Sequence, residues 1–313
     1  MTGCRAPDWD TALFAMITPD AIARGLARPI VDRLAAGGFT VGQCRVIAPS
    51  HDQVDSMTEA QITGRGQVFR ARSLHTLFDL GPSLALALVD TRSRPADRRV
   101  ADAALLKGAA PPAPAQPGSI RQALGALNTV LSLMHIADSG TDSRRESAIL
   151  APGHAWLDGR RLDALLGLLT PAVPERRGHR EVVRAVRGRL IAAVGPVLDP
   201  VTAARLLEES MAGPTAEQRL AGVLTVLEGA PDSERAAPYA RLLRHDFTTA
   251  AEPMDIDFME LLLGSLGVGL DAWERAVLET SQHFHPPHAA NRKGAQDAST
   301  VAVERTPGVT ERR

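Results

Sequence analysis

Few side chains in this sequence have a type and spacing that suggest chemistry, and His135 is the first of them. It directly follows the apolar run LNTVLSLM at 127–134, so we expect it at the end of a buried strand. An imidazole there can act as a nucleophile, although it is more commonly a hydrogen-bonded structural residue. Ser132 and Asp138 flank it at three-residue spacing, which at a strand end does not form a hydrogen-bonded relay. We therefore do not interpret these residues as a catalytic triad.

Two further groups of polar side chains have a chemical and a simpler interpretation. Three arginines lie close together in the sequence: Arg65, Arg70 and Arg72. They can line a phosphate cleft, but a solvated helix face is the simpler explanation. Three histidines lie near the C-terminus: His283, His285 and His288. Their spacing suits a metal ion, but they border a polar tail, so we predict no metal site.

Composition excludes several classes of protein. The chain has 313 residues and a formal net charge of −1, so it has no excess of basic side chains, and we do not expect it to bind nucleic acid. Cys4 and Cys44 are the only cysteines, which excludes a disulfide framework and a cysteine zinc site. The longest apolar runs, 83–89 and 261–270, are far shorter than the ~20 residues of a membrane span. Residues 1–10 lack the apolar core of a secretory signal, so we expect a cytoplasmic protein.

The first half of the sequence alternates apolar runs with helical periodicity. Apolar runs at 13–18, 39–47, 83–90 and 127–134 are typical of buried strands. The segment from Asp20, which can cap a helix, to Gly37 has helical spacing, and helical material also fills 49–80. We expect further helices at 95–107 and 120–125, on either side of a proline-rich loop at 109–118. This order predicts an α+β domain, a split β-α-β arrangement with helices on one face of a small sheet.

The second half is helical almost throughout. From residue 158 onward, leucine and valine recur at helical spacing between glycine and proline breaks, so we expect an all-α domain of short helices. After residue 285 the apolar periodicity ends and polar residues dominate. We therefore divide the chain into four parts: a leader at 1–10, an α+β domain at 11–150, a helical domain at 151–285 and a disordered tail at 286–313.

Two segments of the first domain together resemble the nucleoside diphosphate kinase family. The first is TPDAIARGL at 18–26, continued by Gly38-Phe39, which is similar to the family's K-P-D-A-x-x-R-G-L opening and its G-F. The second is PGSIR at 117–121 followed by HIADS at 135–139, which is similar to P-G-T-I-R and H-G-S-D-S. The resemblance covers about residues 11–150. It implies the family's ferredoxin-like α+β fold.

The resemblance also implies roles for individual residues. His135 corresponds to the histidine that carries the phosphoryl group in the family, and Arg121 to an arginine that contacts phosphate. Ser139 corresponds to a serine near that histidine. Two side chains could hold the other nitrogen of this imidazole ring, Glu146 and Asp142. Such a histidine must be neutral, held through its other nitrogen and surrounded by cations or amides that stabilise phosphate charge.

Several family residues are replaced in this chain. Thr18 stands where the family has a phosphate-contacting lysine, and Ile136 stands where a glycine follows the histidine. The asparagine three residues before the histidine is Ser132. The second phosphate-contacting arginine has approximate substitutes among three residues: Arg98, Arg99 and Lys107. The loss of one preorganised donor costs on the order of 10²–10³ in rate, so we expect weak or lost turnover.

Two functions from different classes remain open. In the first, a nucleoside triphosphate with Mg²⁺ transfers its γ-phosphoryl group to His135, which passes it to a nucleoside diphosphate. In the second, the domain is a catalytically degenerate scaffold that binds a nucleotide or has a regulatory role while the helical domain engages a protein partner. The segment 255–284 can offer an amphipathic face to such a partner, although packing inside the helical domain is the simpler explanation. The resemblance further implies a homo-oligomer.

Overall fold

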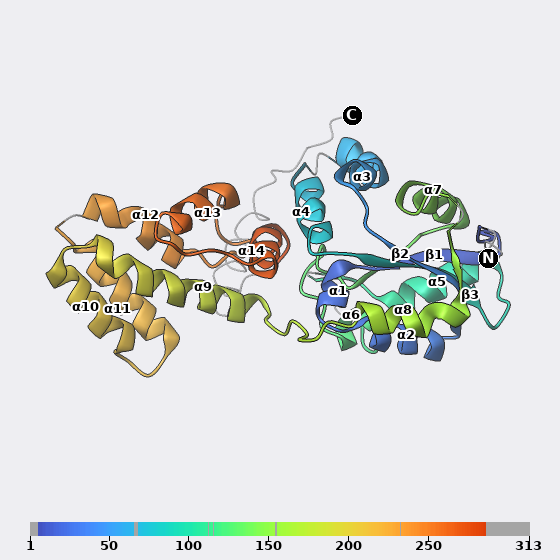
Figure 1. Cartoon of the computed structure of the whole chain (residues 1–313), viewed down its shortest axis with the longest axis horizontal. Coiled ribbons are helices and arrows are strands. Elements are labelled where there is room, and N and C mark those ends of the chain that lie inside the picture. Colours follow the sequence, from blue (N-terminus) through green and yellow to red (C-terminus); the bar gives the residue numbers. More distant parts are fainter. Residues whose placement is uncertain are drawn as a thin grey trace, which may run out of the picture.

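The computed structural model describes residues 6–285 apart from 66, 67, 112, 115, 154 and 232, and the side chains of 60–71 also lie outside the described part. Two halves lie side by side: one contains a sheet with helices, the other only helices (Figure 1). The predicted tail at 286–313, including His288, and the first half of the predicted leader lie outside the described residues.

The sheet has its strands in the order β4-β1-β3-β2-β5, and each neighbouring pair is antiparallel. Its strands are β1 (Ala12–Ile17), β2 (Phe39–Ile47), β3 (Ser83–Asp90), β4 (Met134–Ile136) and β5 (Leu157–Asp158). The first three confirm the predicted strands almost residue for residue. The order of the first four strands is that of the predicted split β-α-β fold.

The predicted strand at 127–134 is wrong: β4 contains only three residues and begins at Met134. The segment before it turns instead of extending, because the Asn128 side chain accepts hydrogen bonds from the amides of Val130 and Leu131, each at 2.9 Å. This local side-chain turn competes with strand pairing. The apolar composition of the segment reflects burial and not strand structure.

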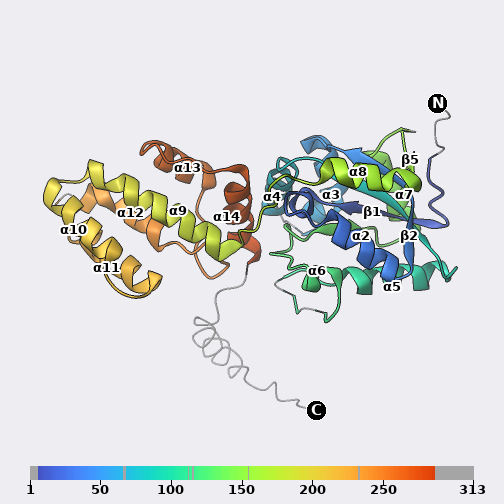
Figure 2. The same ribbon diagram turned by 60° about the horizontal axis from the view of Figure 1, so that its bottom comes forward.

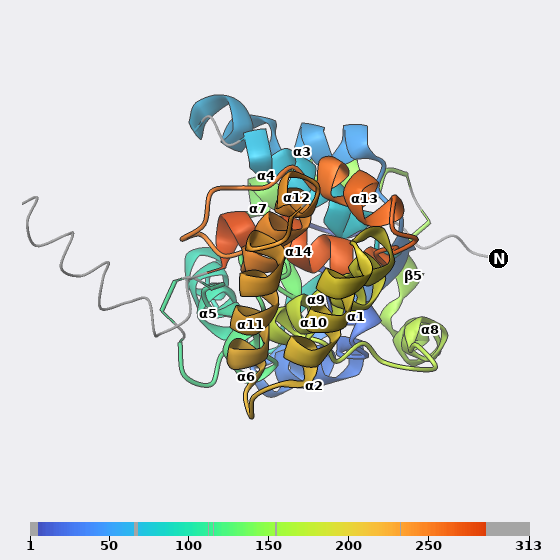
Figure 3. The same ribbon diagram turned by 90° about the vertical axis from the view of Figure 1, so that its left-hand side faces the viewer.

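Helices cover both faces of the sheet, which corrects the expectation of helices on one face. All six residues of β1 are buried, and alternate side chains point to opposite faces. Leu13, Ala15 and Ile17 pack in one core with α1, α2, α5, α6 and α8, whereas Phe14 and Met16 pack in a second core with α3, α4 and α7. Figure 3 shows α3 and α4 on the opposite side of the molecule from α2 and α8.

The helices of the sheet-containing half range from 4 residues in α6 to 15 in α3. Their bounds are α1 (Pro19–Ala23), α2 (Ala27–Ala36), α3 (His51–Arg65), α4 (Val68–Phe78), α5 (Ala96–Lys107), α6 (Ile120–Ala123), α7 (Gly140–Leu150) and α8 (Leu162–Leu169). The single helix expected from Asp20 onward is divided into α1 and α2, because Gly25 between them has φ +68°. That left-handed conformation suits glycine and ends a helix.

The second half is the predicted bundle of helices. Its helices are α9 (His179–Val194), α10 (Pro200–Met211), α11 (Ala216–Glu228), α12 (Ser233–Arg244), α13 (Ile256–Gly264) and α14 (Ala272–Phe284). The buried apolar residues of α9 and α14 belong to the same hydrophobic core as Phe14 and Met16 of β1. In Figures 1 and 2, α14 lies on the side of the bundle that faces α4.

The elements between residues 151 and 169 pack against the sheet-containing half. Strand β5 pairs with β2, and Leu162 and Leu166 of α8 are buried in the core beneath α2. The boundary expected at residue 150 therefore precedes two elements that pack on the first domain. Among the described residues, no helix is long and apolar enough to span a bilayer.

Candidate active site

His135 lies in the middle of the edge strand β4, opposite Met16 of β1. Its two neighbours in the strand are buried beneath the sheet, so the imidazole points to the other face, toward α7. There its Nε2 lies 2.7 Å from Oε2 of Glu146, and 31% of its side chain is exposed. The ring is therefore held through one nitrogen and partly open to solvent.

The contact with Glu146 fixes which ring nitrogen can react. An ionised carboxylate can only accept a hydrogen bond, so Nε2 donates to it and a neutral ring keeps its lone pair on Nδ1. The Glu146 side chain is 8% exposed, and Arg145 places Nη2 3.5 Å from its second oxygen. A carboxylate in this position also stabilises the positive charge that a substituted imidazole acquires.

Lys107 and Arg121 bind the backbone on either side of His135. Lys107, at the end of α5, donates from Nζ to the carbonyl of Ile136 at 3.3 Å. Arg121, on α6, donates from Nη2 to the carbonyl of Met134 at 2.7 Å. Burial and the positive charge of Arg121 lower the pKa of Lys107, while Asp138 and Glu146 act in the opposite direction. Two cations therefore lie beside the histidine strand.

Arg121 also organises the loop before β4. Its Nε donates to the carbonyl of Ser132 and its Nη2 to the Ser132 hydroxyl, both at 3.1 Å. A third donor, Nη1, reaches the carbonyl of Gly108 at 3.1 Å. Ser132 thus contributes a hydroxyl to Arg121 where the family has asparagine. The fork geometry of the guanidinium suits this kind of multiple contact.

Arg98 and Arg99 lie about two turns before Lys107 on α5. Arg98 is 70% exposed and its Nε lies 3.4 Å from a carboxylate oxygen of Asp102. Arg99 is buried and donates to the carbonyl of Asp10 at 2.9 Å. Of the three expected substitutes, Lys107 alone is shown in contact with the histidine strand.

Thr18 follows β1 and forms part of a buried clamp on the residue two before His135. Its hydroxyl donates to Oδ1 of Asp20 at 2.6 Å, and Oδ2 of Asp20 accepts from the amide of Leu133 at 3.0 Å. Leu133 has φ +73°, a left-handed conformation that costs a leucine about 1–3 kcal/mol. The clamp therefore holds strained backbone directly before β4.

Asp20 was expected to cap a helix, and that expectation is wrong because its side chain contacts Leu133 instead. Burial raises the pKa of this carboxyl group, while the hydrogen bond from Thr18, the Leu133 amide and the charge of Arg24 lower it. The sequence marked Asp20 only as a helix cap and as part of the P-D pair. Its role as a backbone clamp depends on a contact between positions 113 residues apart, which no local pattern reveals.

Ser139 begins α7, the helix that carries Glu146. Its hydroxyl oxygen accepts from the amide of Asp142 at 3.0 Å, as an N-cap does, and its hydroxyl donates to the Asp142 carboxylate at 2.6 Å. Asp142 therefore pairs with the cap, and the carboxylate in contact with His135 is Glu146. Ser139 is therefore the cap of the helix that carries Glu146.

A stacked pair of histidines, His51 and His75, lies on the α3–α4 hairpin, and sequence reasoning did not single it out. The rings of His51 and His75 are stacked with centroids 4.1 Å apart. His51 contacts Asp79 at 2.8 Å, and His75 contacts Asp55 at 2.7 Å. The signal available in the sequence was a histidine followed four residues later by an aspartate, at 51/55 and again at 75/79. Three arginines of these helices were candidates for a phosphate cleft. Arg72 donates to Glu279 on α14, and the side chains of Arg65 and Arg70 lie outside the described part.

The fold and this site define a class: an α+β domain of split β-α-β topology with a carboxylate-held histidine on its edge strand. Residues 11–154 match the family model described as nucleoside diphosphate kinase. The nucleoside diphosphate kinase of Pelobacter propionicus is 32% identical over 139 residues, which span 43% of this chain and 88% of the relative. That of Mycolicibacterium vanbaalenii is also 32% identical, over 44% of this chain and 94% of the relative. The chain belongs to the nucleoside diphosphate kinase family.

A solved structure completes the comparison. It is a transition state mimic of nucleoside-diphosphate kinase from Borrelia burgdorferi with bound vanadate and ADP. It is 20% identical, covers 44% of this chain and 84% of its own, and has a TM-score of 0.38. The helical half of this chain, α9 to α14, lies beyond the residues that the family model matches.

Proposed function

We propose that the first domain transfers a γ-phosphoryl group from a nucleoside triphosphate to a nucleoside diphosphate through a phosphohistidine at His135. The observation that carries the proposal is the carboxylate of Glu146 2.7 Å from Nε2, which leaves Nδ1 as the nucleophile. Lys107 and Arg121, the two cations on the adjacent carbonyls, supply the positive charge that a transferring phosphoryl group requires.

The proposed reaction has two displacements at phosphorus. In the first, the Nδ1 lone pair of His135 forms a bond to the γ-phosphorus, and the bond from that phosphorus to the bridging oxygen breaks, so a nucleoside diphosphate leaves. In the second, a terminal oxygen of another nucleoside diphosphate attacks the phosphohistidine and the N–P bond breaks. Glu146 stays bound to Nε2 throughout and balances the charge of the substituted ring.

Mg²⁺ fits this reaction as part of the substrate. The described residues contain no group of three or more histidine, cysteine, aspartate or glutamate side chains arranged to hold a metal. Mg²⁺ prefers phosphate oxygens and water and keeps few protein ligands at such sites. It therefore enters with the nucleotide, where it neutralises phosphate charge.

The proposed turnover is slow compared with family members that have the full set of cations. Position 18 carries a buried threonine hydroxyl in place of a lysine ammonium group. Arg121 donates hydrogen bonds to the carbonyls of Gly108, Ser132 and Met134. A missing donor costs on the order of 10²–10³ in rate, so we expect the formation of the phosphohistidine to be slowed.

The test is phosphorylation of the whole chain with γ-labelled ATP and Mg²⁺, followed by a chase with a nucleoside diphosphate. Wild-type protein is expected to acquire an acid-labile label that leaves on the chase, and His135→Ala is expected to remain unlabelled. His245→Ala is the matched control, because His245 lies in the helical half, where its ring contacts the Glu252 carbonyl and the Phe247 amide. Equal labelling of wild type and His135→Ala, or no label on either, would overturn the proposal.

One observation favours a second function, that of a regulatory module. Helix α4 of the first domain is tied to α14 of the helical half through Glu279, which accepts from Arg72 and from Thr76, both at 2.7 Å. A partner that binds the helical half can therefore act on the first domain through α4. We propose that the chain functions through these two domains in the cytoplasm, with a homo-oligomer and a protein partner on the helical half as further proposals. Size-exclusion chromatography with light scattering tests the oligomer.

A further inference from the structure

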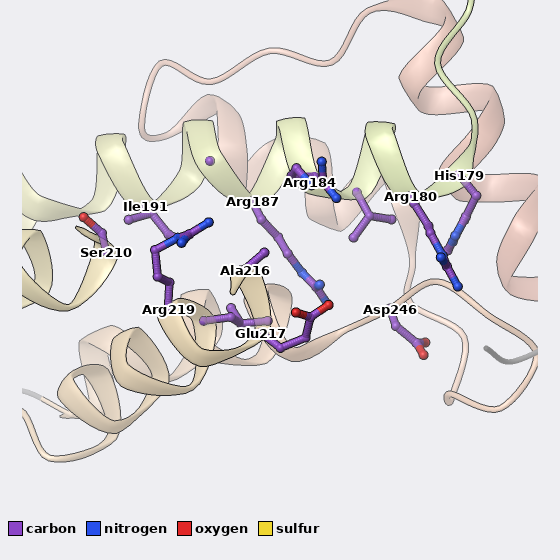
Figure 4. A pocket seen from close by; sticks show the side chains of 13 residues that line it. His179, Arg180, Arg184, Arg187, Ile191, Ser210, Ala216, Glu217, Arg219 and Asp246 are labelled. Atoms are coloured by element: carbon purple, nitrogen blue, oxygen red, sulfur yellow. The ribbon is translucent and has the colours of Figure 1, made fainter. Parts of the chain in front are cut away.

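The helical half contains a cavity of about 680 Å³ between α9 and the first turns of α11, far in sequence from His135 (Figure 4). Ser210 of α10 and Asp246, after α12, complete its walls. A volume of this size lies in the range of small-molecule sites, which is about 300–1,000 Å³. Neither the match to the kinase family nor the proposed phosphohistidine reaction involves these residues.

Arginine side chains dominate this cavity. Arg180, Arg184 and Arg187 lie at i, i+4 and i+7 on one face of α9, and Arg219 enters from α11. At 1.5 Å per residue the three on α9 extend over about 10 Å. Figure 4 shows Arg187 reaching from α9 toward the start of α11. Donors that start from positions spread over two helical turns suit a chain of phosphate groups better than a single small anion.

Arg187 is the most enclosed of these cations. Its Nη2 donates to the carbonyl of His245 at 2.8 Å, and its buried Nε has no hydrogen-bond acceptor among the residues that the structure describes. Burial lowers the pKa of this arginine, against the opposing charges of Asp246 and Glu217. A buried guanidinium donor without an acceptor is costly, so a bound anion would remove a real penalty.

The charge around the cavity favours an anion. Four guanidinium groups face two carboxylates, those of Glu217 and Asp246, so positive charge is in excess. The pKa of Glu217 is lowered by its own backbone amide and by Thr215, with Arg184 and Arg180 contributing. The first turns of α9 and α11 both contribute residues to the lining, and the positive ends of helix dipoles favour negative charge.

The remaining wall is apolar. Val183 and Ile191 from α9 and Leu220 from α11 line the cavity beside the arginines. An apolar wall next to guanidinium groups suits a molecule that has both a ring or hydrocarbon body and an anionic chain. The paired N–H donors of a guanidinium group can bind two oxygens of one phosphate, and several such groups together favour a phosphate chain over an isolated carboxylate.

We propose that this cavity is a binding site for a small molecule that carries a di- or triphosphate chain. Two sources share this chemistry, a free nucleotide and an inorganic polyphosphate, and the apolar wall distinguishes them. A nucleotide uses the wall for its base or sugar, so ATP should bind more tightly than tripolyphosphate. Equal affinities would assign the site to the phosphate chain alone.

The test measures binding and its location in the whole chain. Titration calorimetry with tripolyphosphate, ATP, citrate and adenosine gives the affinities, and hydrogen–deuterium exchange locates the site. Tripolyphosphate is expected to protect peptides from 179–191 and 213–222, and citrate and adenosine are expected to bind at least 10-fold more weakly. Protection confined to the first domain, or none in the helical half, would overturn the proposal.

Two variants and a control make the result specific. Arg184→Gln and Arg187→Gln should each weaken tripolyphosphate binding about 10-fold or more, because each removes a charged hydrogen-bond donor. Arg187 also holds the His245 carbonyl, so Arg184→Gln, an exposed position, serves if the other variant unfolds. Arg235→Gln, an exposed arginine of α12 outside the cavity lining, should bind as wild type does. Equal weakening in all three variants would contradict a site at the cavity.

The outcome is separable from that of the proposed kinase activity. His135→Ala should lose the acid-labile label and keep the exchange protection in 179–191. Arg184→Gln should lose the protection and still acquire the label. If His135→Ala abolished protection in the helical half, the cavity would not be an independent site, and the inference would fail.

Discussion

At the scale of single residues, the role proposed for His135 depends on a few hydrogen bonds. Glu146 contacts Nε2 of the ring, and Lys107 and Arg121 donate to the carbonyls on either side of it. Asp20 and Thr18 hold the strained Leu133 just before the strand. Each contact can be changed singly, and each change has a distinct expected result.

Glu146→Gln is expected to slow phosphohistidine formation about 10- to 100-fold. The amide keeps a hydrogen-bonding group near Nε2 but removes the charge that stabilises the substituted ring, and a hydrogen bond to a charged group is worth about 1.5–3 kcal/mol. The measurement is the initial rate of label incorporation. Glu181→Gln on α9, remote from His135, is the control, and an unchanged rate in Glu146→Gln would exclude this role.

Thr18→Lys is expected to accelerate labelling, on the order of 10-fold. A lysine at the end of β1 restores an ammonium group beside the strand of His135, and its partner in the fold is the carboxyl group of Asp20. Thr18→Met has similar length without charge and should give no gain. The contrasting outcome is an equal rate in the two variants, which would show that charge at position 18 is not what limits the reaction.

The buried Asp20 is expected to give the protein a stability that falls as pH rises. Burial raises its folded pKa above the ordinary 3.8, so the folded state binds the proton more tightly than the unfolded state. Its contribution is complete below about pH 3.8 and is lost as pH rises through the folded value. Asn at position 20 cannot ionise, so Asp20→Asn should lack this fall. Urea unfolding at pH 4 to 8 compares the two slopes, and parallel slopes would contradict the assignment.

At the scale of elements, short segments with specific ends position the site. β4 is an edge strand of three residues, held by β1 on one side and by the Arg121 contacts from α6. Helix α7 starts at the Ser139 cap and carries Glu146 two turns later to His135. The ends of these elements therefore matter more to the site than their lengths.

Ser139→Ala is expected to lower the free energy of unfolding by about 1 kcal/mol, the typical cost of removing an N-cap. The first turn of α7 loses the acceptor for the Asp142 amide, so labelling of His135 should also slow through misplacement of Glu146. Ser265→Ala is a matched control, since Ser265 lies at the end of α13 and its hydroxyl donates to the Leu262 carbonyl. Urea denaturation measures both, and equal losses would refute the capping role.

At the scale of the whole molecule, the helical half and the kinase-like half share one hydrophobic core and a few buried hydrogen bonds. Besides the Glu279 contacts with α4, Asn128 donates to the Thr280 hydroxyl at 2.8 Å. Val277 and Leu278 of α14 belong to the same buried cluster as Leu77 of α4. We therefore expect the two halves to unfold together.

Glu279→Gln is expected to weaken this coupling. The Glu279 side chain is 5% exposed and bonds to Arg72 and Thr76, so loss of its charge should cost about 1.5–3 kcal/mol. Calorimetry should show one unfolding transition for wild type and a broadened or divided one for the variant. Glu260→Gln, in the more exposed pair with Arg275, should cost under about 1 kcal/mol. A single unshifted transition in Glu279→Gln would mean that the apolar core alone joins the halves.

The sequence by itself determined the family, the α+β fold with a helical half, and the strands β1, β2 and β3. These follow from local periodicity and from motifs whose order and spacing survive in a divergent chain, because burial of each strand leaves a repeating apolar pattern. It also singled out His135, Arg121 and Lys107. The resemblance supplied Glu146 as one of two partners for the ring.

Only the tertiary structure decided the contacts that cross the fold. It placed Glu146 rather than Asp142 on His135, showed β4 as three residues and put helices on both faces of the sheet. It also gathered the arginines of α9 and α11 around one cavity. Such contacts join residues that are distant in sequence, and their energies depend on burial and geometry that appear only once the chain has packed.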